Sequence, residues 1–158
     1  MRWHYRDPPL VWLLVWSYAA HLAEEYLGGF PAWFVTIAGR PLPIGVFVAI
    51  NAVAFVGMVL AARAAIRSEM LGWLAITIAT VLLVNGLAHL VASLATGSYS
   101  PGLITGVVLY LPIAQLVLLR AWHQVPGAFF WQGVGAGVAV HGLVVVAALV
   151  GSGLALAY

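Results

Sequence analysis

The chain has 158 residues, of which 65% are hydrophobic and only 6% are charged, and its formal net charge is +2 at pH 7. Soluble domains carry roughly 25% charged residues, so this chain has too few polar side chains to cover a water-facing surface, and lipid must surround most of it. The absence of cysteine excludes disulfides and thiolate metal sites, and six scattered arginines without a basic stripe exclude a nucleic-acid partner.

Five segments are long and apolar enough, or nearly so, to cross a membrane, which takes about 20 residues. They lie at 10–27, 44–66, 70–96, 101–120 and 127–150, with turn residues in the connections at 28–43, 67–69, 97–100 and 121–126. The first segment leads into HLAEEYLGG and not into a cleavage site, so we expect it to be retained. We therefore predict a single domain over 1–158, an all-α integral membrane bundle of five transmembrane helices.

The arginines predict the orientation of this bundle. With the N-terminus inside, Arg40 alone lies outside, and the other five lie inside: Arg2, Arg6, Arg63, Arg67 and Arg120. Basic residues favour the cytoplasmic side, so we predict the N-terminus inside and the C-terminus outside. The expected location is a bacterial plasma membrane, with membrane lipid as a partner and the oligomeric state left open.

Polar residues from four predicted helices fall at one depth. At a rise of about 1.5 Å per residue, His21, Glu24 and Glu25 lie ~17–22 Å from the inner boundary. On the same scale Asn51 lies at ~20 Å, Asn85 and His89 at ~22–28 Å, and His141 at ~21 Å, with Tyr99 in the adjacent outer turn. Gly133, Gly137 and His141 share a face, where the glycines would allow close helix packing. The alignment predicts one polar pocket in the outer half of the membrane.

Three short motifs stand in order along the chain: H-L-A-E-E at 21–25, N-G-L-A-H at 85–89 and Y-S-P-G at 99–102. Together they resemble the HXXEE family of small membrane proteins, whose pattern is HxxEE, NxxxH and YxPG. The resemblance covers residues 21–102, about half of the chain. It implies no activity, cofactor or substrate.

Ionised carboxylates are costly in hydrocarbon, so the cluster should face the interior of the bundle. Our first interpretation is a membrane enzyme performing metal-free acid/base chemistry, of isomerase or cyclase type, on a lipophilic small molecule such as an isoprenoid. Glu24 or Glu25 would donate a proton and His21 or His89 would accept one. The substrate would be bound by Asn51, Asn85, Tyr99 and His141.

The second interpretation is a divalent metal cofactor, zinc or iron, held by His21, Glu25 and His89. Zinc would make the protein a hydrolase, and iron would make it an oxidase. A third interpretation is proton or cation transport, although the inner halves of the helices offer few ionisable groups for a relay. The fourth interpretation is a network of hydrogen bonds among these polar side chains that only stabilises the bundle, without catalysis.

Overall fold

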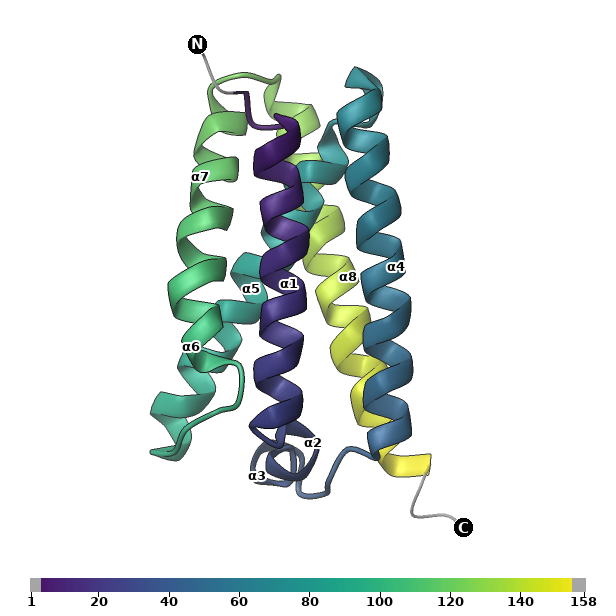
Figure 1. The fold of residues 1–158 in the computed structure, drawn as a ribbon, viewed down its shortest axis with the longest axis vertical. Helices are drawn as coiled ribbons and strands as arrows, with labels where there is room; N and C mark the ends of the chain where they lie inside the picture. Colours follow the sequence, from purple (N-terminus) through teal and green to yellow (C-terminus); the bar gives the residue numbers. More distant parts are fainter. Residues whose placement is uncertain (1–3, 155–158) are drawn as a thin grey trace.

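A computed structural model describes residues 4–154 of the chain, and this part is built from helices without any strand. The long helices are α1 (Pro8–Leu27), α4 (Ile44–Arg67), α5 (Trp73–Thr96), α7 (Leu111–Trp122) and α8 (Gly127–Leu154). They run along a common long axis as one bundle (Figure 1). The prediction of an all-α fold is confirmed for this part of the chain.

Four helical stretches are long and apolar enough to cross a membrane: Ile44–Arg67, Glu69–Thr96, Leu103–Trp122 and Gly127–Gly153. They correspond to the second to fifth predicted segments. Helix α1 is not among them, because its two leading prolines, His21 and both glutamates lower its hydropathy. Its 20 residues nevertheless lie alongside the other long helices (Figure 1).

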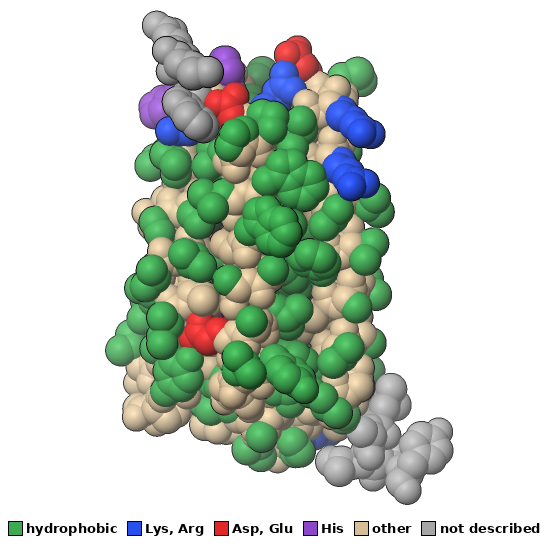
Figure 2. Space-filling model, viewed as in Figure 1, with side chains coloured by type: hydrophobic (Ala, Val, Ile, Leu, Met, Phe, Trp, Pro, Cys, Tyr) green, Lys and Arg blue, Asp and Glu red, His purple; other side chains and the backbone are tan. Residues whose placement is uncertain are grey.

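The surface agrees with a membrane environment. Apolar side chains cover most of the sides of the bundle, whereas most of the basic, acidic and histidine side chains in view lie at the end where the N-terminus lies (Figure 2). Large apolar side chains on the sides are exposed, Trp16 and Leu94 among them. A water-soluble bundle would bury such residues, so these sides face lipid.

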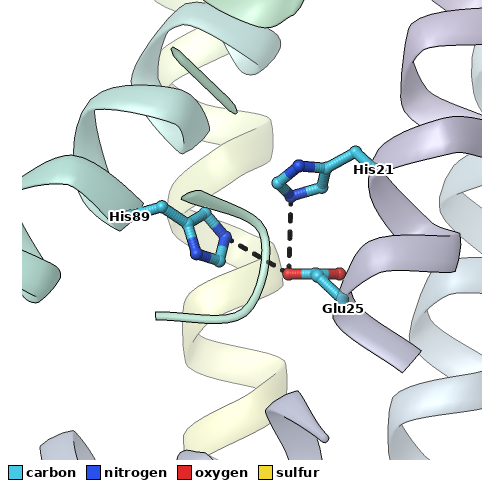
Figure 3. Close-up of side chains that lie close together, drawn as sticks. All are labelled: His21, Glu25 and His89. Carbon is cyan, nitrogen blue, oxygen red and sulfur yellow. Dashed lines mark ion pairs between the residues drawn. The ribbon is translucent and has the colours of Figure 1, made fainter. Parts of the chain in front are cut away.

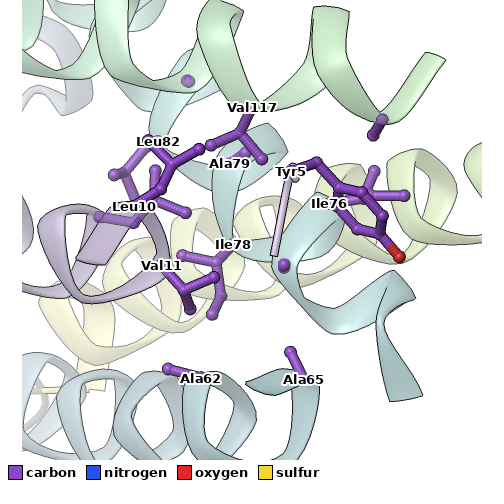
Figure 4. Close-up of a cluster of buried hydrophobic side chains, with 14 of the residues drawn as sticks. Tyr5, Leu10, Val11, Ala62, Ala65, Ile76, Ile78, Ala79, Leu82 and Val117 are labelled. Atoms are coloured by element: carbon purple, nitrogen blue, oxygen red, sulfur yellow. The ribbon is translucent and has the colours of Figure 1, made fainter. Parts of the chain in front are cut away.

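The apolar core lies where α5 meets α1, α4 and α7 (Figure 4). Leu14, Ile76 and Leu82 are fully buried there. Helix α8 packs closely on α5, as its predicted glycine face suggests: a methyl group at Gly133 would lie 2.7 Å from the Cβ of Ile76, and one at Gly137 would lie 2.5 Å from the Cβ of Thr80. Only glycine allows this approach.

Two segments differ from the sequence-based expectation. The connection at 28–43, predicted to be a turn, contains two one-turn helices, α2 (Phe30–Trp33) and α3 (Val35–Ala38). The predicted helix at 101–120 is divided into α6 (Leu103–Thr105), the π-helical segment η2 (Gly106–Tyr110) and α7. Pro112 accounts for the π-helical segment, because proline lacks an amide hydrogen and clashes with the preceding turn of an α-helix.

Candidate metal centre and cavity

The centre of the site consists of His21 and Glu25 on α1 and His89 on α5. The Nε2 atoms of His21 and His89 lie 3.5 Å and 3.3 Å from the same oxygen, Oε1 of Glu25. Figure 3 shows both rings pointing at this carboxylate from two helices. All three residues are buried, and one potential ligand atom from each lies within 4.8 Å of the others.

Two hydroxyl groups hold the far sides of the imidazole rings. His21 Nδ1 lies 2.8 Å from Thr105 Oγ1, and His89 Nδ1 lies 2.9 Å from Ser100 Oγ. The Thr105 hydroxyl also lies 3.5 Å from the carbonyl oxygen of Gly102, to which it can donate its own hydrogen while accepting one from His21 Nδ1. The tautomer with the hydrogen on Nδ1 would leave the Nε2 lone pair of His21 free for a metal ion.

Gly102 separates the two rings from the backbone of the turn before α6. A methyl group there would lie 2.7 Å from Cε1 of both His21 and His89. The backbone at Gly102 also has a φ of +105°, a value that residues other than glycine rarely adopt. The glycine of the Y-S-P-G motif thus lets the turn pass directly beside the histidines, where Ser100 and Thr105 reach them.

Glu24 points away from this centre and binds the start of α6. Its carboxylate accepts hydrogen bonds from the amides of Gly102, Ile104 and Thr105 at 3.2, 2.9 and 2.7 Å, and from the hydroxyl of Tyr99 at 2.5 Å. A carboxylate on unpaired amides at the start of a helix is a stabilising arrangement. Burial, together with the bond to Glu24, raises the pKa of the Tyr99 phenol to about 12.

The π-helical segment brings Tyr110 onto the centre. Its ring stacks on His21 with centroids 4.4 Å apart and planes at 29°. Gly106, in the same segment, packs on Gly86 of α5, where an added methyl group would lie 3.2 Å from the Cα of Gly86. The close approach of these two backbones sets the position of Tyr110.

A cavity of about 820 Å³ opens at the centre and extends between α4, α5 and α8. Six of the eight residues selected from the sequence line it: His21, Glu25, Asn51, Asn85, His89 and His141. Glu24 and Tyr99 do not line it and contact each other instead. At the end of the bundle opposite the start of α1, Phe30 and Trp33 on α2 and Phe34 directly after it lie in the wall of the cavity.

Several buried polar atoms in the cavity wall have no hydrogen-bond partner within the described chain. They are Nε2 of His21, Oδ1 of Asn85, the hydroxyl of Tyr110 and Nε1 of Trp33. Asn51, in contrast, accepts a hydrogen bond from Tyr18 at 2.6 Å. Unpaired buried polar groups are rare in folded proteins, so their grouping around one cavity indicates a ligand site.

Sequence reasoning did not find Ser100, Thr105, Tyr110 or Trp33. Ser100 lies inside the Y-S-P-G motif, where the sequence indicates only a turn, and Thr105 and Tyr110 have no distinctive spacing. The one available indication for Trp33 was the spacing of Phe30, Trp33 and Phe34, which is that of one helical face.

The residues at the centre fit a divalent metal ion. A tetrahedral zinc ion with bonds of about 2.0–2.1 Å holds neighbouring ligand atoms roughly 3.3 Å apart, which matches the two separations measured here. Both histidines have a hydrogen bond at Nδ1, as metal-binding histidines generally do. Two imidazoles and one carboxylate suit zinc or iron.

Comparison with known proteins places the chain in a family. No curated protein and no solved structure matches it. The sequence profile of a family described as "Protein of unknown function with HXXEE motif" matches residues 12–117, which include all three motifs and more than half of the chain. The chain therefore belongs to the HXXEE family.

Proposed function

We propose that this protein is a metal-dependent membrane enzyme that acts on a lipophilic substrate, with His21, Glu25 and His89 as its metal ligands. The observation that carries this proposal is the convergence of two Nε2 atoms and one carboxylate oxygen at one wall of a large apolar cavity. Three protein ligands leave a coordination position for water or substrate, as catalytic zinc sites do.

The separations are longer than strong hydrogen bonds and are compatible with a bridging metal ion. Charge-assisted hydrogen bonds between nitrogen and oxygen measure about 2.7–2.9 Å, whereas the two histidines lie 3.5 Å and 3.3 Å from Glu25. His21 Nε2 has no hydrogen-bond partner in the described chain. A bound metal would supply a Lewis acid: with zinc the expected activity is a hydrolase, and with iron it is an oxidase.

Metal-free acid/base catalysis of isomerase or cyclase type is the second candidate. It is supported by the unpartnered hydroxyl of Tyr110 and the amide oxygen of Asn85 beside Glu25 and His89, because these groups would orient a substrate for proton transfer. In this version Glu25 is the acid, since the carboxylate of Glu24 is occupied by backbone amides and Tyr99.

Transport and a purely structural role have less support. A proton relay needs ionisable groups along its whole length. On α5, the described cavity wall from Asn85 to Leu74 carries no ionisable group, so a relay along this helix would end at Asn85. A purely structural hydrogen-bond network would pair its polar groups. In the wall of this cavity three polar side chains besides Trp33 have an atom without a hydrogen-bond partner in the described chain: His21, Asn85 and Tyr110.

We also propose that α1 crosses the membrane with the other four helices, with the N-terminus inside and the C-terminus outside, in a bacterial plasma membrane. Arg6, Arg63, Arg67 and Arg120 belong to the end of the bundle where α1 begins and α4 and α7 end. Arg40 follows α3 at the opposite end, where it donates to the carbonyl of Leu149. Arg2 lies outside the described residues.

The metal is testable without knowing the substrate. Protein purified from cells supplied with zinc and iron should contain about one metal ion per chain, and His21→Ala and His89→Ala should each reduce this at least about tenfold. The matched control is His123→Ala, which removes an exposed histidine of the turn between α7 and α8. Cobalt substitution should give the visible spectrum of a four-coordinate ion.

The opposite result is equally clear. Folded wild-type protein that takes up none of these three metals would contradict the metal proposal and leave acid/base catalysis as the better one. Equal metal content in wild type, His21→Ala and His89→Ala would place the metal elsewhere in the molecule.

A further inference from the structure

We propose that the cavity binds an elongated, uncharged amphiphile. Its one polar group lies at the centre formed by His21, Glu25 and His89, and its apolar body extends between α4 and α5 toward Leu74. The inference rests on the proposed function for the role of the centre, but it names the class of molecule that reacts there and how that molecule lies.

The cavity is long in one direction. On α5 it is lined from His89 to Leu74, and at about 1.5 Å per residue this stretch is roughly 22 Å long. On α4 it is lined from Phe47 to Ala61, which is a similar length of about 21 Å. A molecule that fills it is therefore elongated and lies along the helix axes.

The wall remote from the centre has no free polar group among the described residues. It is formed by side chains such as Ala54, Met58, Ala61, Leu74, Ile78 and Val81. Thr77 also lies there, but its hydroxyl is bonded to the carbonyls of Trp73 and Gly133 at 3.1 Å each. This part of the cavity matches a hydrocarbon body and offers nothing to a second polar group.

The wall near the centre differs, because it carries a hydrogen-bond acceptor and a hydrogen-bond donor without partners. Asn85 Oδ1 is an unpaired acceptor, and the Tyr110 hydroxyl, on a side chain only 1% exposed, is an unpaired donor. A ligand hydroxyl placed between them would donate to Asn85 Oδ1 and accept from the Tyr110 hydroxyl. An alcohol is therefore the simplest polar group that completes this wall.

The side chains of the cavity favour a neutral head group over an anionic one. Glu25 is the one acidic residue in its described wall, and no arginine lines it. Phosphate groups are recognised by arginine, lysine, helix amides or a metal ion, so a phospholipid or an isoprenoid diphosphate would depend on the proposed metal alone, whereas an alcohol also bonds to Asn85 and Tyr110. The ligand is thus a neutral lipophile, from either an acyl or an isoprenoid source.

The ligand can reach the cavity from the lipid. Val53 on α4 and Leu143 on α8 both line the cavity, yet their side chains are 75% and 68% exposed at the surface of the bundle. Toward the outer end the same two helices close together, where a methyl group at Gly151 would lie 2.5 Å from Val46. The opening between α4 and α8 therefore faces the membrane interior.

Gly57 provides a sharp test, because it lines the cavity on α4 about 9 Å beyond Asn51. A Cβ there meets nothing within 4 Å, so a side chain can start at this position, and we expect Gly57→Leu to narrow the cavity at this depth. Gly45→Leu is the matched control, since Gly45 lies on the same helix, outside the cavity, and also has open space around it. The probes are radiolabelled octanol and hexadecanol, with hexadecyl phosphate as competitor, on purified protein in one detergent.

We expect Gly57→Leu to weaken hexadecanol binding at least about tenfold and octanol binding less than about twofold, while Gly45→Leu changes neither. Geranylgeraniol in place of hexadecanol distinguishes isoprenoid from acyl preference. The proposal is overturned if Gly57→Leu weakens both alcohols equally or neither, or if hexadecyl phosphate displaces hexadecanol better than unlabelled hexadecanol does.

Metal content measured on the same samples separates this inference from the proposed function. Chain-length-dependent binding by protein without metal would support the amphiphile and contradict the metal. Metal retained in Gly57→Leu without any chain-length dependence would support the metal and contradict the amphiphile.

Discussion

At the scale of single residues, Gly102 contributes more to the centre than its lack of a side chain suggests. Gly102→Ala would place a methyl group 2.7 Å from Cε1 of both His21 and His89 and would force alanine to a φ of +105°. We expect this variant to lose at least about tenfold in metal affinity, because the rings must rotate away from Glu25. Metal titration of the purified variant measures the loss.

Gly97→Ala is the control for backbone strain alone. Gly97 has a φ of +62° and open space around its Cα, so alanine there should cost about 1 kcal/mol of stability and leave the metal affinity unchanged. Equal metal affinity in Gly102→Ala and wild type would show that the turn does not hold the rings.

Tyr99 gives the protein a predictable response to alkaline pH. Its pKa is raised from 10.0 to about 12, so the folded state favours the protonated phenol that donates to Glu24. The resulting stability is fully present below pH 10 and is lost as the pH rises toward about 12. Thermal unfolding across this range should show a steeper loss in wild type than in Tyr99→Phe.

The prediction concerns the difference between wild type and Tyr99→Phe, because a second tyrosine also responds to alkaline pH. Burial raises the pKa of Tyr5 as well, and this contribution is common to both. Parallel curves for wild type and Tyr99→Phe would contradict a stabilising role for the bond to Glu24.

The residue scale also shows what spacing can and cannot predict. His21, Glu25 and His89 were selected because they share a depth, and the structure brings them together. Glu24 was selected with them, but neighbouring residues on an α-helix point about 100° apart, and the sequence does not say which of two adjacent glutamates faces inward. Ser100 and Thr105 could not be predicted because their role depends on the path of the turn.

At the scale of elements, the packing of α8 on α5 depends on glycine. Gly137→Ala would bring a methyl group to 2.5 Å from Thr80 Cβ and 2.8 Å from the carbonyl oxygen of Thr77. Because a backbone atom cannot move aside, we expect a loss of about 1–3 kcal/mol. Unfolding by denaturant in detergent measures this loss.

Gly135→Ala is the matched control on the same helix, since an added Cβ there meets nothing within 4 Å. Alanine at that position should be neutral or stabilising, because it favours the helix. Destabilisation of the same size in both variants would mean that the α5–α8 contact is not close.

The long elements were predictable because apolar length is a strong pattern in a chain that is 65% hydrophobic. The segments at 28–43 and 106–110 were not. One-turn helices such as α2 and α3 are too short to show a period, and they form because Phe30 and Phe34 pack over the end of the bundle with Phe47. Pro112 is a local reason for an irregular turn near 106–110, but the backbone that this turn adopts also depends on the packing of Gly106 against Gly86, which is remote in sequence.

At the scale of the whole molecule, the number of crossings and their direction are open to direct measurement. The chain has no cysteine, so single substitutions His4→Cys, Ser68→Cys and Ser98→Cys report one position each. In intact cells an impermeant maleimide should label Ser98→Cys alone. His4→Cys and Ser68→Cys should react only after the membrane is opened.

Each site distinguishes a different topology. Labelling of His4→Cys from outside, with Ser68→Cys still protected, would mean that α1 does not cross the membrane. Labelling of both His4→Cys and Ser68→Cys from outside would mean that the orientation is the reverse of the proposed one. The fold alone does not depend on either result, because the contacts between helices are the same in all three cases.

The bonds of Glu24 have a consequence for biosynthesis. Helix α1 leaves the ribosome first, but the amides and the hydroxyl that bind Glu24 follow some 75 to 81 residues later, and His89 follows at a similar distance from Glu25. Until then two carboxylates stand in α1 without their partners, at a cost of about 3 kcal/mol or more for each if ionised in hydrocarbon. The polar contacts of α1 can therefore form only after α5 and α6 have been synthesised, although α1 is made first.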